Sequence, residues 1–136
     1  MEGSIYFYNF SPIVDIVTLV GRITGQRLEH GTPFTVDYYR NSNNQEVLLV
    51  GDDGGYLHEL TFTDRAWHAC DGHLPSKCHN YEVFRGISCA RKKRHSGWLT
   101  KVKYVDTLGA IVTSSVSGEL CVWDAEKGKL LSQYVM

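Results

Sequence analysis

Thiol and imidazole side chains gather in one segment of the chain, where Cys70, His73, Cys78 and His79 lie close together in sequence. Thiolates and imidazoles are the ligands that zinc prefers in proteins. The order Cys-x2-His-x4-Cys-His, however, fits no standard zinc-finger arrangement. We therefore interpret this segment as a solvated loop and assign no metal, while a zinc site on these residues stays open as the alternative.

Candidate catalytic groups are sparse. Cys78 adjoins His79, but a nucleophile needs a base that points toward it, and neighbouring residues of a strand or loop usually point apart. Asp52 and Asp53 lie in a glycine-rich turn, where aspartate is favoured for hydrogen bonds to the local backbone. The glycines beside them lead to no lysine and no helix, both of which a phosphate-binding loop requires. We expect no enzyme activity and no cofactor.

The run Arg91, Lys92, Lys93 and Arg94 is the one strongly basic stretch in a chain whose formal net charge is −1. Such a run can contact phosphate or an acidic protein surface. Aromatic residues do not interleave with it, which removes the stacking partners that single-stranded nucleic acid uses. We interpret the run as a solvated connector and, as a binding site, favour an acidic protein partner over nucleic acid.

The composition bounds the class of protein. Apolar residues make up 43% and charged residues 21% of the 136 residues, as in ordinary globular domains. No apolar run is long enough to cross a membrane, and the first residues lack the pattern of a secretory signal. The four cysteines form no Cys-x-x-Cys pair. We expect free thiols, no membrane contact and an intracellular, cytoplasmic location.

Three segments repeat one pattern and indicate the elements that position these residues. Gly3 to Asn9, Gly55 to Thr61 and Gly118 to Asp124 each begin with glycine, place an aliphatic residue two positions later and continue as a strand. Matching strands and short turns surround the second and third segments. The remaining expected strands are Ser11 to Ile23, Phe34 to Tyr39, Glu46 to Val50, Leu99 to Val105, Ala110 to Ser114 and Lys129 to Val135. The repeating unit of four antiparallel strands is typical of a propeller blade.

The last unit resembles the WD40 repeat family. It begins His95-Ser96-Gly97-Trp98 and ends Val122-Trp123-Asp124, as in the family's histidine-started, Trp-Asp-ended repeat. The middle unit has the same layout but ends Leu60-Thr61, and the first matches only two strands. The resemblance implies an all-β fold, a partial WD40-type propeller of about two and a half four-stranded blades. We expect two strands of a first blade at 1–27, a second blade at 28–71, an inter-strand insertion at 72–94 and a third blade at 95–136.

The resemblance also implies a hydrogen-bonded network within a blade. In the family, a turn aspartate, a histidine, a serine or threonine and the tryptophan can bond to one another. His95, Thr113 and Trp123 match three of these roles, and Ser117 stands at the aspartate position. We expect a weakened network in the last blade and none in the middle blade.

Aromatic residues are the candidate partner-binding groups. Tyr38, Tyr56 and Trp98 belong to the residue types that most often anchor protein interfaces. Trp98 follows the inter-blade loop, at the rim where propellers of this family receive partners. Packing between neighbouring blades is the open alternative for Trp98.

These observations predict a non-catalytic protein–protein interaction scaffold. Closed propellers have roughly four to eight blades, so the chain is expected to be a fragment or isoform of a larger propeller protein, or to close by self-association. The last unit and the phrase Leu48 to Gly55 resemble WD-repeat proteins associated with cilia and flagella, which makes a ciliary or flagellar location a further expectation. The alternative function is a zinc-stabilised recognition module that uses the Cys/His segment.

Overall fold

The computed structural model describes residues 5–11, 16–23, 31–62 and 87–136, and it is all-β in these ranges apart from one 3-10 turn at Asp106–Leu108. The strands form a two-stranded hairpin, β1-β2, and two four-stranded antiparallel sheets, β3-β4-β5-β6 and β7-β8-β9-β10. The bounds are β1 (Ile5–Ser11), β2 (Ile16–Ile23), β3 (Pro33–Arg40), β4 (Glu46–Asp52), β5 (Tyr56–Phe62), β6 (Ile87–Lys93), β7 (Leu99–Val105), β8 (Ala110–Ser115), β9 (Glu119–Asp124) and β10 (Leu130–Val135).

Glycines at positive φ close the two central hairpins. Gly55 (φ 83°) ends the turn between β4 and β5, and Gly118 (φ 86°) ends the turn between β8 and β9. A side chain at position 55 would also collide with the chain, since its Cβ would lie 2.1 Å from the carbonyl oxygen of His95. The two glycine-led strands that the sequence repeats are therefore hairpin strands at equivalent places in the two sheets.

The fourth strand of the middle sheet comes from a segment that was expected to be an insertion. Residues 87–93 form β6 and pair with β5 from Phe62↔Ile87 to Tyr56↔Lys93. The middle four-stranded sheet therefore extends beyond the expected boundary at residue 71. The sequence analysis missed this strand because it interpreted the four basic residues as a connector. Charged residues are, however, common on the edge strands of sheets.

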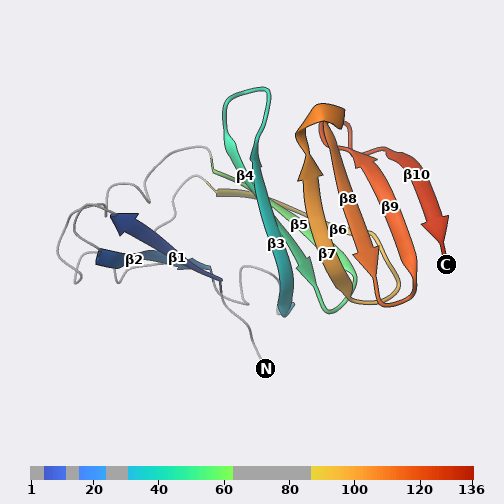
Figure 1. Ribbon diagram of the computed structural model, residues 1–136, viewed down its shortest axis with the longest axis horizontal. Helices are drawn as coiled ribbons and strands as arrows, with labels where there is room; N and C mark the ends of the chain where they lie inside the picture. The colour runs from blue at the N-terminus through green and yellow to red at the C-terminus, as the bar shows by residue number, and fades with distance from the viewer. Residues whose placement is uncertain (1–4, 12–15, 24–30, 63–86) are drawn as a thin grey trace.

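The two four-stranded sheets pack through their first strands, and β7 lies beside β3 in Figure 1. The backbone N–H of Val102 donates to Thr35 Oγ1 at 3.2 Å, and that of Tyr104 donates to Asp37 Oδ2 at 2.7 Å. Side chains of β3 thus satisfy backbone donors of β7 that have no strand to pair with.

An apolar core fills the space between these sheets. Its buried members come from both sheets: Val47, Leu49, Leu57, Leu99, Val102, Ile111, Cys121 and Trp123. Within the part of the chain that the structure describes, no helix is long and apolar enough to cross a membrane.

Candidate functional site

A hydrogen-bonded network joins three of the predicted blade residues in the last sheet. Thr113 Oγ1 accepts a bond from the indole Nε1 of Trp123 at 2.9 Å and lies 2.7 Å from Nε2 of His95. Nδ1 of the same imidazole lies 2.9 Å from Glu119 Oε2. Every atom is satisfied when the threonine hydroxyl donates to Nε2 and the Nδ1–H donates to the carboxylate. His95 and Thr113 are buried, so these bonds hold the sheet together.

Ser117 does not join this network in the structure. Its hydroxyl bonds to that of Ser115 inside the β8–β9 turn. Glu119, which the sequence analysis did not single out, bonds to His95 instead. The glutamate side chain on β9 is longer than that of serine and reaches the imidazole of His95. This contact becomes visible only when the strands are paired in the structure.

The middle sheet carries a buried polar pair that the sequence analysis missed. Asp52 Oδ2 lies 2.7 Å from Nε2 of His58, and the two side chains are 1% and 0% exposed. The other oxygen, Oδ1, accepts bonds from the backbone N–H groups of Gly54 and Tyr56 at 2.8 and 2.9 Å. Expecting no polar network here was incomplete, because an aspartate at the end of β4 and a histidine on β5 build one of a different kind. Nδ1 of His58 has no partner among the described residues.

The basic run lies on the edge of the middle sheet and partly covers an aromatic ring. The guanidinium carbon of Arg91 lies 3.6 Å from the ring centroid of Tyr56, and Nζ of Lys93 lies 5.5 Å from it. These distances suit cation–π contacts. Tyr56, a predicted partner-binding residue, is therefore packed under the basic strand and only half-buried.

The end of the basic run connects the two sheets. The guanidinium carbon of Arg94 lies 4.0 Å from the ring centroid of Trp123, and Nη2 donates to the carbonyl oxygen of Gly128 at 3.2 Å. Burial lowers the pKa of Arg94 below its usual value. Lys92 also reaches this turn, since a Cβ on Gly128 would lie 2.9 Å from its Nζ. The run was expected to be a solvated connector, and Arg91, Lys92 and Lys93 are exposed, but Arg94 at its end is half-buried in a contact between the two sheets.

Two predicted aromatic residues are exposed. Tyr38 on β3 is 70% exposed, and Trp98, just before β7, is 43% exposed. Trp98 also meets Phe34 edge to face, with centroids 4.8 Å apart and planes at 84°. Trp98 therefore packs against a residue of the neighbouring sheet and also presents surface to solvent, while partner binding by Trp98 stays a prediction.

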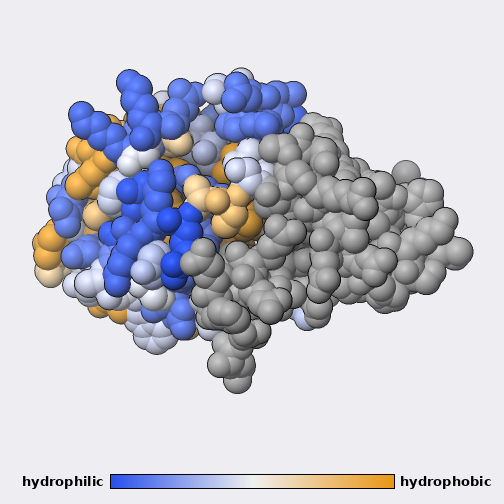
Figure 2. Space-filling view, turned by 180° about the vertical axis from the view of Figure 1, so that it is seen from behind, coloured by the Kyte–Doolittle hydropathy of each residue, from blue (hydrophilic) through white to orange (hydrophobic). Residues whose placement is uncertain are grey.

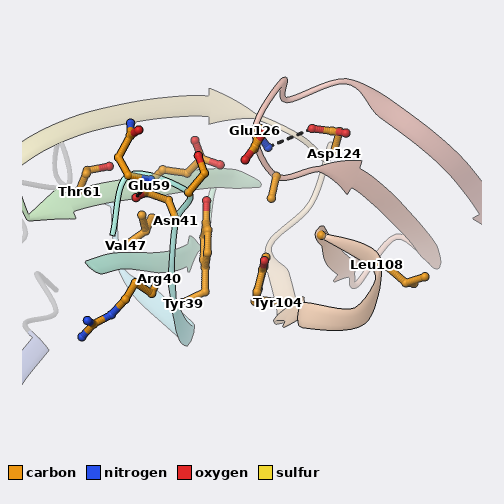
Figure 3. A pocket seen from close by; sticks show the side chains of 14 residues that line it. Tyr39, Arg40, Asn41, Val47, Glu59, Thr61, Tyr104, Leu108, Asp124 and Glu126 are labelled. Atoms are coloured by element: carbon orange, nitrogen blue, oxygen red, sulfur yellow. Dashed lines mark hydrogen bonds between the residues drawn. The ribbon is translucent and has the colours of Figure 1, made fainter. Parts of the chain in front are cut away.

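A cleft of about 510 Å³ opens between the sheets beside the β3–β4 and β9–β10 turns (Figure 3). The rings of Tyr39 and Tyr104 stack in it, with centroids 4.1 Å apart. Burial, and then the nearby Glu59 carboxylate, raise the pKa of Tyr39 to about 12. Glu59, Asp124 and Glu126 line the same cleft, which can accept hydrogen bonds from a cationic group. No pattern in the sequence pointed to it, because its walls come from turns and strands of both sheets.

The predicted metal ligands Cys70, His73, Cys78 and His79 lie outside the described residues. In residues 5–11, 16–23, 31–62 and 87–136, no group of three or more His, Cys, Asp or Glu side chains could hold a metal ion. Cys121, which is buried on β9, is a free thiol.

The outer face of the last sheet is the side of β7–β10 that points away from β3–β6. Strand register identifies it: Lys103 pairs with Val112, and Val112 pairs with Val122. Val112 alternates with the buried residues Ile111 and Thr113, which belong to the opposite side. By the same alternation the outer face comprises Lys101, Lys103, Val112, Ser114, Leu120, Val122, Ser132 and Tyr134.

The middle sheet has a face at the equivalent positions, and it is covered. Aligning the hairpin glycines places Leu57 with Leu120, since each stands two positions after its glycine. Leu57 is 1% exposed, whereas Leu120 is 39% exposed. Asp37 lies on the same side of the middle sheet as Leu57. Its carboxylate accepts a hydrogen bond from the backbone N–H of Tyr104 on β7, so the last sheet covers this face. The outer face thus repeats the pattern of a covered face, but no other sheet of the described residues packs on it.

Neither a family model nor a curated protein matches this chain.

Proposed function

We propose that this protein is a non-catalytic protein-interaction scaffold built from WD40-like blades, and that the outer face of its last sheet is the docking surface. The observation that carries the proposal is the contrast between Leu57, covered by the neighbouring sheet, and Leu120, exposed at the equivalent position. A surface that repeats the pattern of an occupied interface, yet is open, suits a partner that packs as another sheet.

The blade interpretation is supported by the repeated unit. Both four-stranded sheets follow sequential antiparallel order, and β3 and β7 occupy the same position in each. The sheets stack through these first strands, as repeats do when each buries its face against the next. The bonds among His95, Thr113 and Trp123 match the network that the WD40 resemblance implies.

Charge indicates what a partner brings to the outer face. On the middle sheet, Thr35 and Asp37 accept backbone hydrogen bonds from the incoming strand. Register places Lys101 and Lys103 at the corresponding positions of the last sheet, and both are exposed. Lysine ammonium groups only donate hydrogen bonds, so a matching partner supplies acceptors there, such as carboxylates or free carbonyl groups.

The absence of catalysis is part of the proposal. The two buried histidines among the described residues, His58 and His95, are both bonded inside the sheets. Neither lies beside a cysteine or serine nucleophile in a cleft, as acyl or phosphoryl transfer would require.

Affinity capture with the intact chain tests the proposal. The immobilised native protein is compared with Leu120→Lys, which places a charge in the centre of the outer face, and with Thr107→Lys, an equally charged change in the exposed 3-10 turn. We expect at least one protein to bind native and Thr107→Lys protein and to be lost from Leu120→Lys. Equal binding to all three folded proteins would contradict the docking surface.

A further inference from the structure

The two outermost strands of the four-stranded sheets differ in how they protect their free edges. Among the described residues, β6 pairs only with β5 and β10 only with β9. β6 carries Arg91, Lys92 and Lys93, and charge of this kind keeps foreign strands from adding to an edge. β10 reads Leu-Leu-Ser-Gln-Tyr-Val and carries no charge. Its edge is open to another strand.

Exposure supports the same contrast. Leu131, Tyr134 and Val135 are 53%, 61% and 70% exposed. Figure 2 shows apolar surface at the left margin of the described part, the side on which β10 lies after the half-turn from Figure 1. An uncharged strand with exposed apolar side chains and one unpaired edge is a typical site for the addition of another strand.

Backbone geometry decides which residues of β10 present their polar groups to the free edge. The N–H of Met136 donates to the carbonyl oxygen of Gly118 at 3.0 Å, and Tyr134 pairs with Leu120 in the same register. Alternate residues of an antiparallel strand bond to the same neighbour. The N–H and C=O groups of Gln133 and Val135 therefore point away from β9, toward the free edge.

We propose that β10 pairs with β10 of a second copy of this chain, antiparallel and about a twofold axis at Gln133. This register brings together the backbone groups that face outward, because the two Gln133 residues exchange bonds and Val135 lies opposite Leu131 of the second copy. Ser132 then lies opposite Tyr134. No charged residue opposes another, so the strand is self-complementary.

The second copy is favoured over a foreign strand by this symmetry. Because β10 carries no charge, a second copy related by this axis brings no like charges together, and it places the apolar side chains of Leu131 and Val135 opposite one another. The inference does not depend on the proposed docking surface, because strand addition uses the backbone N–H and C=O groups of Gln133 and Val135, whereas docking on the outer face uses its side chains.

The solution mass of the full chain, measured by size-exclusion chromatography with light scattering over a wide concentration range, tests the proposal. We expect the native protein to reach twice its 15.4 kDa mass. Gln133→Pro removes the N–H at the axis without removing a bond to β9, and we expect it to stay monomeric. Gln133→Thr keeps that N–H and is the matched control, so it dimerises as the native protein does.

A second variant keeps the test decisive if the proline variant does not fold. Gln133→Lys sets two ammonium groups opposite one another and weakens dimerisation by about fivefold or more. Circular dichroism identifies which variants are folded. A native protein that is monomeric at every concentration would overturn the proposal. So would a dimer that survives both the proline and lysine changes but is lost in Leu120→Lys, because it would form through the outer face.

Discussion

Strands β4 and β8 hold equivalent places in the two four-stranded sheets, yet they are buried differently. In β4, every residue from Val47 to Asp52 is buried, on both faces of the sheet. In β8, burial alternates, and Val112 and Ser114 are only half-buried. Alternation of this kind marks a strand with one covered face. The middle sheet therefore behaves as an interior layer, whereas the last sheet is an end layer.

The contrast shows that the neighbour, and not the residue type, decides burial at these positions. Positions 57 and 120 are both leucine, yet their exposure differs because the last sheet packs over Leu57 and no sheet of the described residues packs over Leu120. The polar positions differ as well, since Asp37 accepts a backbone bond and its counterpart Lys103 is exposed. The last sheet thus has leucine at the same position of its outer face, but lysines where the middle sheet has hydrogen-bond acceptors.

The largest expected effect is the stability difference between the paired leucines. Leu57→Ala leaves a cavity in the core and lowers the free energy of unfolding by about 2–5 kcal/mol. Leu120→Ala removes a side chain that is 39% exposed and lowers it by less than about 1 kcal/mol. Urea unfolding followed by circular dichroism measures both. Equal losses would show that the outer face is already covered in the isolated chain.

The next effect concerns the rim of the same two faces. Asp37→Ala leaves the N–H of Tyr104 without its charged acceptor and lowers the free energy of unfolding by about 1.5–3 kcal/mol. Lys103→Ala, at the equivalent exposed position, changes it by no more than about 0.5 kcal/mol. The same urea titration compares them. A stabilising Asp37→Ala would mean that this hydrogen bond does not hold the sheets together.

The smallest effect is a pH dependence in the cleft between the sheets. Because burial and Glu59 raise the pKa of Tyr39 from 10 to about 12, the folded protein holds this proton at a pH where the unfolded chain has released it. Stability from Tyr39 is complete below pH 10 and is lost as the pH rises from 10 toward 12. Unfolding at a series of alkaline pH values should show this loss, and Tyr39→Phe should reduce it. An identical profile in the variant would assign the loss to other groups.

Much of the fold could be predicted because the strands carry local signals. Residues Leu99–Val105 were expected as a strand and are one, and turns were expected directly before Gly55 and Gly118, which the structure places at positive φ at the ends of these turns. β6 was missed because its basic residues hide a strand whose edge needs charge. Periodicity reveals what alternates along one strand, and it does not reveal which edge of a sheet the strand occupies.

The candidate site was less predictable, because its groups meet across strands. The bonds that link Thr113 to His95 and to Trp123 were expected from the resemblance, but the bond from His95 to Glu119 depends on side-chain reach. Tyr39 and Tyr104, which stack on one another, are far apart in sequence and belong to two different sheets. Contacts between repeats require knowledge of how the repeats stack.

The most direct test of the central claim is photo-crosslinking from the outer face. A photoreactive phenylalanine analogue at position 120 samples the open surface, and the same analogue at position 107 samples the exposed 3-10 turn. We predict that, in cell extract, position 120 forms a covalent product with a distinct second protein and position 107 does not. Crosslinking no stronger at position 120 than at position 107 would contradict the assignment of the outer face as a docking surface.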